Sequence, residues 1–165
     1  MSITCTAPSK TFNLAGLQIS NIFIANPTIR HKFKKALFST GFCEPNIMGL
    51  VACQTAYTYG ESWLKELKTY LAQNLAFTRA FLNENLPQIK LVEPEGTYLI
   101  WLDFSPLSLT TPELEELITN KANLWLDGGT MFGIEGTNFQ RINIACPRAT
   151  LEKALTQLKT AIDNR

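Results

Sequence analysis

The chain has 165 residues, of which 45% are hydrophobic and 18% charged, and its formal net charge is +1. This length is typical of one domain that buries about two thirds of its unfolded surface, and the near-zero charge gives no electrostatic reason to expect a nucleic-acid or membrane partner. No apolar run approaches the ~20 residues that a membrane-spanning helix needs, and no charged-then-apolar leader opens the chain, so we expect a cytoplasmic protein.

Residues 4–9 are small, polar and turn-rich, and they precede a lysine, Lys10. Pro8 fixes one backbone dihedral, and Lys10 follows in a loop ahead of an apolar run. Because Phe12 and Leu14 flank this loop, we expect the Lys10 amine to be partly desolvated, which favours the neutral form that attacks an aldehyde. An ordinary exposed loop lysine explains the same residues, and residue types do not separate the two interpretations.

A strand and a helix are predicted next. Residues 17–25 (LQISNIFIA) are apolar, rich in isoleucine and bounded by turn residues, which predicts a buried strand. Asn26 and Pro27 then open a helix to about residue 38, since asparagine suits the N-cap and proline the first turn. The apolar positions of this helix are Ile29, Phe33 and Leu37. Its basic face is usually a solvated surface, with a contact to phosphate or an acidic partner as the alternative.

A second helix start at Pro45 and Asn46 leads into a periodic pattern that reaches about residue 85. This length is too great for one ordinary globular helix, so we expect a kink near Gly60. The aromatic residues of the stretch are Tyr57, Tyr59 and Trp63. Aromatic residues at helical spacing are more often core residues than a ring-stacking site, and both interpretations stay open.

Two strands, a helix and a short strand are predicted beyond Pro87. The strands are expected at 89–92 and 97–104, with a turn between them. The helix runs from residue 111 to about 122, and the short strand occupies 123–126.

A glycine-rich loop follows at residues 127–136 (DGGTMFGIEG). It is weak evidence for nucleotide binding, because neither a helix nor a lysine comes after it. Thr150 is expected to cap a final amphipathic helix.

Arg141 lies in the middle of a strand predicted over residues 139–145, on the face opposite Ile142. An arginine in mid-strand needs an anionic partner if it is buried, and its planar fork fits the α-carboxylate of an amino acid. A surface arginine on a half-exposed strand is the alternative, and the residues by themselves favour it slightly.

Cysteine usage gives no sign of a metal site. The four cysteines contain no Cys-x-x-Cys pair, and His31 is the single histidine. A structural metal site is therefore not expected, and reduced thiols are. The cysteines are Cys5, Cys43, Cys53 and Cys146.

Two segments resemble one enzyme family. Residues 7–17 (APSKTFNLAGL) resemble the cofactor-lysine segment of the class I/II aminotransferase superfamily, the fold-type I pyridoxal-phosphate enzymes, and in detail its MalY/PatB subgroup of cystathionine β-lyase-like C–S lyases. Residues 141–148 (RINIACPR) resemble the motif whose first arginine binds the substrate carboxylate. The resemblance implies that Lys10 binds pyridoxal 5'-phosphate covalently and moves the proton at the substrate Cα, and that Arg141 binds the carboxylate. Gln18 departs from the phosphate-binding arginine of many relatives.

The resemblance also implies a fold class, a mixed α/β chain that forms the C-terminal part of a fold-type I enzyme. Such enzymes are more than twice as long and carry the lysine past their middle. Residues 1–45 then belong to the large cofactor-binding domain and 46–86 to a linking helix. Residues 87–165 form the small domain, a mostly antiparallel sheet covered by helices.

The function implied by the resemblance is β-elimination on a sulfur-containing amino acid, giving a thiol, pyruvate and ammonia. Transamination is the alternative within the family. A third hypothesis is that the chain alone is an inactive folding or association module without a complete cofactor site. The complete enzyme is expected to be a homodimer that acts on a small amino-acid substrate.

Overall fold

The computed structural model describes residues 2–42 and 44–165. Its chain divides into two compact units, Met1–Lys68 and Thr69–Arg165, each described below by itself. The reduced thiol expected at Cys43 lies outside the described residues, while Cys5, Cys53 and Cys146 are free thiols. None of the helices in the described part of the chain combines the length and the apolar character that a membrane crossing requires.

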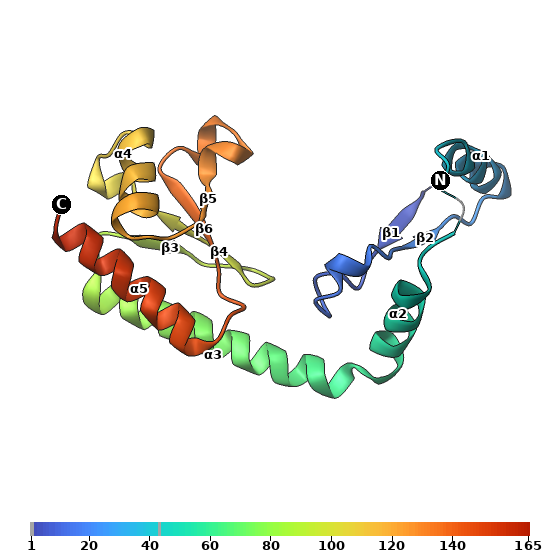
Figure 1. The fold of residues 1–165 in the computed structure, drawn as a ribbon, viewed down its shortest axis with the longest axis horizontal. Helices are drawn as coiled ribbons and strands as arrows, with labels where there is room; N and C mark the ends of the chain where they lie inside the picture. Colours follow the sequence, from blue (N-terminus) through green and yellow to red (C-terminus); the bar gives the residue numbers. More distant parts are fainter. Residues whose placement is uncertain (1, 43) are drawn as a thin grey trace. The chain divides into compact units, whose positions relative to one another are not determined.

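The first unit combines a small antiparallel sheet with helices (Figure 1). The two strands pair in antiparallel register, with Thr4 opposite Phe23. A 3₁₀ turn precedes the second strand, and the first turns of the long helix α3 close the unit. The elements are β1 (Thr4–Thr6), the 3₁₀ turn Ala15–Leu17, β2 (Asn21–Phe23), α1 (Pro27–Ser39), α2 (Ile47–Tyr59) and α3 (Glu61–Asn85).

Local signals set the helix starts of this unit as predicted. The Asn26 side chain accepts a hydrogen bond from the Ile29 N–H at 3.0 Å, and the Asn46 side chain accepts one from the Gly49 N–H at 2.7 Å. The break near Gly60 is also confirmed, because α2 ends at Tyr59 and α3 begins at Glu61. The helix starts and the break are thus encoded locally, by cap residues and by one glycine.

The long buried strand predicted over residues 17–25 is wrong. A 3₁₀ turn occupies its start, β2 is three residues long, and the Phe23 side chain is 60% exposed. Only Ile19 and Ile24 of this stretch are buried. The physical reason is that β2 pairs with β1 alone in a two-stranded ribbon, so the described residues supply no second layer to cover it.

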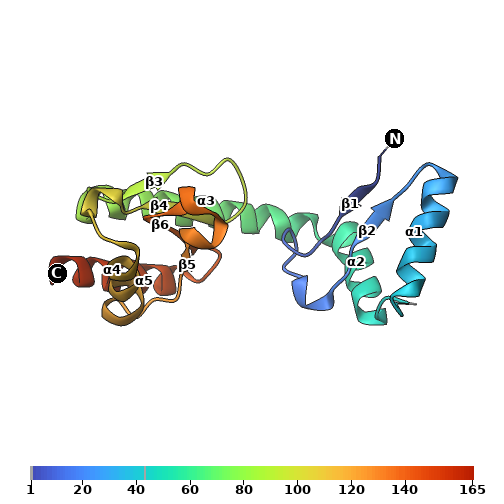
Figure 2. The ribbon, with the colours of Figure 1, turned by 90° about the horizontal axis from the view of Figure 1, so that it is seen from above.

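The second unit is a four-stranded antiparallel sheet with helices packed on it (Figure 2). The strand order is β3-β4-β6-β5. The expected mixed α/β architecture with a mostly antiparallel sheet is confirmed here. The strands are β3 (Lys90–Val92), β4 (Leu99–Asp103), β5 (Asp127–Gly128) and β6 (Phe139–Asn143), and the helices are the later part of α3, α4 (Thr111–Glu116) and α5 (Arg148–Asp163).

One face of this sheet forms a contiguous apolar core with the helices. Along β4 and β6, alternate residues such as Ile100, Leu102 and Ile142 are buried, as the two-residue period of a strand requires. Helix α5 contributes a stripe at helical spacing, which includes Leu151 and Leu155. The opposite face of the sheet is therefore the one that carries Arg141.

Two predictions for this unit are wrong in position. Residues 123–126 do not form a strand, because a π-helical turn (Leu117–Lys121) is followed by Asn123 at a φ of 52°. The Leu124 N–H then donates to the Ile118 carbonyl at 2.9 Å, and the strand begins only at Asp127. The final helix begins at Arg148, two residues before Thr150, with Pro147 at its N-cap.

Asn74 is a fully buried polar residue that ties helix α3 to the end of the sheet. Its side-chain amide donates to the carbonyls of Ile144, at 2.8 Å, and Cys146, at 3.0 Å. Its oxygen accepts a hydrogen bond from Nε of Arg148 at 2.9 Å. The segment between β6 and α5 is thus fixed by one side chain.

Replacement of Asn74 by alanine is expected to lower the free energy of unfolding by about 3 kcal/mol, because two carbonyls and a guanidinium lose their buried partner. Urea unfolding followed by circular dichroism measures this loss. Asn120→Ala is the control, since the exposed Asn120 side chain lies in the π-helical turn after α4 and donates a hydrogen bond to the exposed Glu116 carboxylate one turn earlier, and it should cost less than about 0.5 kcal/mol. Equal losses for the two variants would contradict the role given to Asn74.

Candidate functional site

Lys10 lies in a tight turn that backbone hydrogen bonds fix on both sides. The Phe12 N–H donates to the Pro8 carbonyl at 2.9 Å, and the Leu14 N–H donates to the Ser9 carbonyl at 3.0 Å. Pro8 is buried, whereas the Lys10 side chain is exposed. The partial desolvation expected for the Lys10 amine is therefore wrong for the described residues. The prediction assumed that Phe12 lies against the lysine, but its ring packs on Tyr57 and Trp63.

The Phe12 ring packs against aromatic side chains of the first unit's helices. Its centroid lies 5.7 Å from that of Tyr57 and 6.1 Å from that of Trp63. Tyr57 and Trp63 are 55% and 46% exposed, so their interpretation as core residues is wrong. Together with Gly60, these two side chains form the packing site of the Phe12 ring, which we call the Phe12 seat.

Gly60 forms the floor of this seat. A Cβ atom at Gly60 would lie 2.6 Å from Cε1 of Phe12 and 2.4 Å from the Ala56 carbonyl oxygen. The glycine that breaks the long helix thus also lets Phe12 approach the backbone closely. The seat fixes the loop two residues beyond Lys10.

A second anchor holds the chain after the lysine loop. The Asn46 amide donates to the Leu17 carbonyl at 2.7 Å. Gly49 on α2 allows this approach, because a Cβ atom there would lie 2.9 Å from the same Leu17 oxygen. The backbone on the C-terminal side of Lys10 is therefore fixed by α2, while the amine itself remains accessible.

Gly60→Ala is expected to push Phe12 from its seat and so loosen the lysine loop. We expect trypsin to cleave after Lys10 roughly five to thirty times faster, which corresponds to about 1–2 kcal/mol of lost local stability. Quantitative mass spectrometry of the peptide that ends at Lys10 measures the rate. Gly16→Ala is the matched control, because nothing lies within 4 Å of a Cβ atom at Gly16. Equal cleavage rates would show that Phe12 does not hold the loop.

Arg141 lies on β6 directly opposite Asp127 of β5 and Trp101 of β4. Its Nε and Nη2 atoms donate to the same oxygen of Asp127, Oδ2, at 3.1 and 2.6 Å. The Phe132 ring covers the guanidinium, with 4.5 Å between Cζ and the ring centroid. The Arg141 side chain is 26% exposed, so this arginine is half-buried and already has one anionic partner.

The glycine-rich loop positions Phe132 over Arg141. Two 3₁₀ turns, Gly129–Phe132 and Ile134–Gly136, fold the loop back on itself. A Cβ atom at Gly129 would lie 2.1 Å from the Gly136 oxygen, and a Cβ atom at Gly136 would lie 2.1 Å from the Gly129 oxygen. The crossing of these two backbones explains both glycines without a phosphate ligand.

Arg148 and Cys146 have structural contacts. The Arg148 guanidinium lies 4.5 Å from the Phe77 ring centroid and bonds to Asn74. Burial raises the pKa of the Cys146 thiol, which keeps it in the protonated, unreactive form. Among the described residues, no three His, Cys, Asp or Glu side chains gather in a group that could hold a metal ion.

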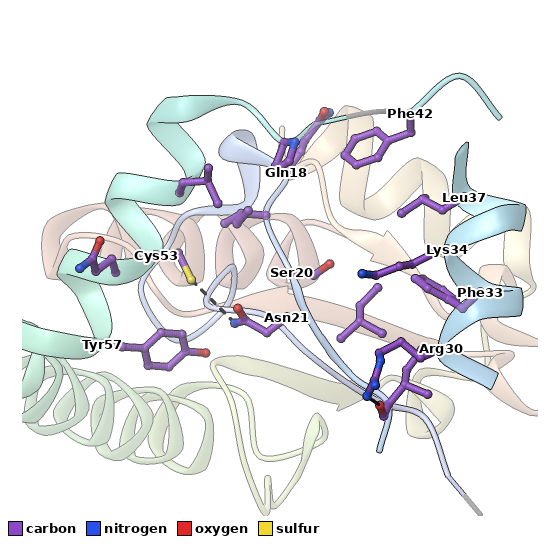
Figure 3. A pocket seen from close by; sticks show the side chains of 16 residues that line it. Gln18, Ser20, Asn21, Arg30, Phe33, Lys34, Leu37, Phe42, Cys53 and Tyr57 are labelled. Atoms are coloured by element: carbon purple, nitrogen blue, oxygen red, sulfur yellow. Dashed lines mark hydrogen bonds between the residues drawn. The ribbon is translucent and has the colours of Figure 1, made fainter. Parts of the chain in front are cut away.

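The first unit also contains an open hollow of about 980 Å³ between β2, α1 and α2 (Figure 3). Its walls are mainly apolar and include Ile24, Phe33 and Leu50. Arg30 and Lys34 of the basic face of α1 also line it, and the Arg30 Nη1 atom donates to the Ile24 carbonyl at 2.9 Å. Lys10 belongs to this first unit and Arg141 to the second.

Comparison with known proteins assigns the chain to a family. The family model described as aminotransferase class I and II matches residues 2–158. The chain therefore belongs to the class I and II aminotransferase family, and the expected fold class is confirmed.

Within this family, the chain is similar to enzymes of known name. It is 42% identical over 162 residues to cystathionine β-lyase PatB of Bacillus subtilis and 34% identical over 158 residues to protein MalY of Escherichia coli. The structure of cystalysin from Treponema denticola, which contains a pyridoxal 5'-phosphate cofactor, matches with a TM-score of 0.93 and 38% identity over 98% of this chain. The chain spans 42% of PatB, 40% of MalY and 41% of cystalysin, about two fifths of each.

Proposed function

We propose that this chain is part of a pyridoxal-phosphate-dependent enzyme that cleaves the C–S bond of an amino acid by β-elimination. The observation that carries the proposal is the similarity to PatB, which is 42% identical over 98% of this chain. Residues 1–45 would belong to its cofactor domain, 46–86 to a linking helix and 87–165 to its small domain. The complete enzyme would be a cytoplasmic homodimer.

The lysine loop fits covalent attachment of the cofactor. The Lys10 amine is exposed, and hydrogen bonds and the Phe12 seat fix the backbone on both sides of it. When bound, pyridoxal phosphate supplies the electron sink for a carbanion at the substrate Cα. Lys10 would hold the cofactor by its aldehyde and move the Cα proton as a general acid and base.

Arg141 would bind the α-carboxylate of the substrate. Asp127 contacts the edge of the guanidinium formed by Nε and Nη2, so among the described residues the edge that includes Nη1 remains for a ligand. Phe132 covers one face of the group and fixes its plane. A carboxylate can then be oriented by charge-assisted hydrogen bonds from an arginine that is already positioned.

Transamination is the second candidate function, because the matched family is that of the class I and II aminotransferases. The same lysine and arginine would serve, and the two reactions would differ in whether the bond from Cβ to sulfur breaks. The third hypothesis is that residues 1–165 alone are an inactive folding or association module without a complete cofactor site.

A chimera tests the proposed reaction. In this PatB chimera, the region of PatB that the chain matches is replaced by residues 1–165. With L-cystathionine, we expect the thiol product, pyruvate and ammonia in equal amounts. Transfer of the amino group to an added 2-oxo acid without thiol release would favour the aminotransferase, and a folded, cofactor-loaded chimera with neither reaction would refute the proposal. The same assay on residues 1–165 alone tests the inactive module.

A further inference from the structure

The second unit contains a hollow of about 350 Å³ that is lined by β5, by α4 and by the π-helical turn after α4. Apolar side chains, among them Ile118, Leu126 and Met131, form much of its wall. Its volume is in the range of small-molecule sites, which combine an apolar lining with a few placed polar groups. We call it the Gln140 hollow, after the polar side chain that lies deepest in the protein.

Gln140 is a buried polar residue whose side chain lacks a partner. It is 4% exposed and lies on β6, on the face that carries Ile142. Among the described residues, every polar side-chain atom that is fully closed off has a hydrogen-bond partner. The Gln140 amide has none there, so its polar atoms are open to the hollow that it lines. An amide in such a buried residue normally forms hydrogen bonds, and this one is free to bond to a ligand.

Gly128 keeps the space in front of this amide open. It lies opposite Gln140 in the sheet, and it lines the same hollow. A Cβ atom at Gly128 would lie 3.9 Å from Nε2 of Gln140 and 4.0 Å from Oε1 of Glu115. The amide and the carboxylate are therefore both within reach of one small ligand placed at this point.

The charges around the hollow indicate what kind of ligand fits. Among the described residues, its charged lining residues are Glu115 and Asp127, both acidic. Asp127 is paired with Arg141, whereas Glu115 forms no ion pair within the described chain. An unbalanced carboxylate beside an amide favours a cation that donates hydrogen bonds. Trp125 also lines the hollow and is 92% exposed, so its ring is available to a cationic or planar group.

We propose that the Gln140 hollow is a binding site for a small organic cation with N–H donors. Its charged group donates hydrogen bonds to the Glu115 carboxylate and to the oxygen of the Gln140 amide, which can turn either end to the ligand. Its apolar part lies against Ile118 and Met131. The site differs from that of Arg141, which lies on the opposite face of β6 and would bind an anion, and it goes beyond the proposed reaction.

Benzamidine, a planar amidinium on an aromatic ring, is the probe for this site. Nuclear magnetic resonance of residues 1–165 labelled with ¹⁵N at glutamine follows the Gln140 amide, whose signal is assigned by its absence from Gln140→Leu. We expect benzamidine to shift this signal with a Kd of about 1 mM or tighter, as is reasonable for a ligand of about nine non-hydrogen atoms. Neutral benzamide and anionic benzoate, which have nearly the same shape, should bind at least about tenfold more weakly.

Two variants assign the binding to the hollow. Glu115→Gln removes the charge and keeps the shape, so it should weaken benzamidine binding roughly tenfold to a hundredfold. Gly128→Ala should also weaken it at least about tenfold, because the added methyl group takes up ligand space. Its contacts of 3.9 and 4.0 Å and a φ of −62° suit alanine, so the fold should survive. The matched controls are Glu95→Gln, at an exposed turn, and Gly96→Ala, where nothing lies within 4 Å of a Cβ atom.

Four results would overturn the proposal. The first is a Gln140 signal that benzamidine leaves unchanged, and the second is equal binding of the three probes. The third is equal binding of benzamidine by Glu115→Gln and the wild-type chain. The fourth is binding by residues 1–165 but not by the folded PatB chimera, since the rest of the enzyme would then cover the hollow. The titration needs no turnover, so an inactive PatB chimera would refute the proposed reaction and leave this site standing.

Discussion

Replacement of Lys10 by alanine is expected to abolish C–S bond cleavage by the PatB chimera. In the proposed function the lysine would supply both the covalent bond to the cofactor and the proton transfer at Cα, so the rate should fall by at least about 10³-fold. The assay is pyruvate release from L-cystathionine under saturating cofactor. The exposed position of the amine makes this a test of chemistry, because its removal leaves no cavity.

Lys32→Ala is the control for this loss. Lys32 is an exposed lysine of α1, and its removal changes the net charge by the same amount. Its activity should equal that of the unmodified chimera. Cleavage by the Lys10→Ala variant at more than a few per cent of the normal rate would contradict the assignment.

Replacement of Arg141 by alanine is expected to reduce kcat/KM of the chimera by roughly 30- to 1000-fold, the usual cost of removing one partner of a desolvated charge pair. Most of the change should appear in KM, because in the proposed role Arg141 would bind the carboxylate in both the ground state and the transition state. Asp127 loses its partner as well, but it is 42% exposed and water can solvate it. The fold should therefore survive the substitution.

Arg79→Ala is the matched control for Arg141. Arg79 also belongs to the second unit and forms two hydrogen bonds of 2.8 Å with a carboxylate, that of Glu93. Its loss should leave KM unchanged, since this ion pair is exposed. An unchanged KM for Arg141→Ala, or an equal rise for both variants, would contradict carboxylate binding by Arg141.

Local sequence signals predicted the elements that depend on a few neighbouring residues. Asparagine caps place the starts of α1 and α2, and Gly60 places the break before α3. The alternation along β6 also follows from the sequence, because the sheet has a buried and an exposed face. Each of these features is decided within about one turn of helix or one pleat of strand.

Features that depend on contacts distant in sequence could not be predicted in this way. The Asp127–Arg141 pair requires the register between β5 and β6, and the seat of Phe12 requires contact between residues nearly fifty positions apart. Asn74 looked like an ordinary residue of a long helix, although it is fully buried. The apolar residues near β2 predicted a buried strand because apolar side chains usually lie under a second layer, and that layer is not among the described residues.

The most direct test of the account is to identify the residue that binds the cofactor. The PatB chimera is loaded with pyridoxal phosphate, reduced with borohydride and digested, and the labelled peptides are identified by mass spectrometry. We expect one phosphopyridoxyl group per chain, attached to Lys10. A stoichiometric label on another lysine, or a folded chimera that takes up no label, would contradict it.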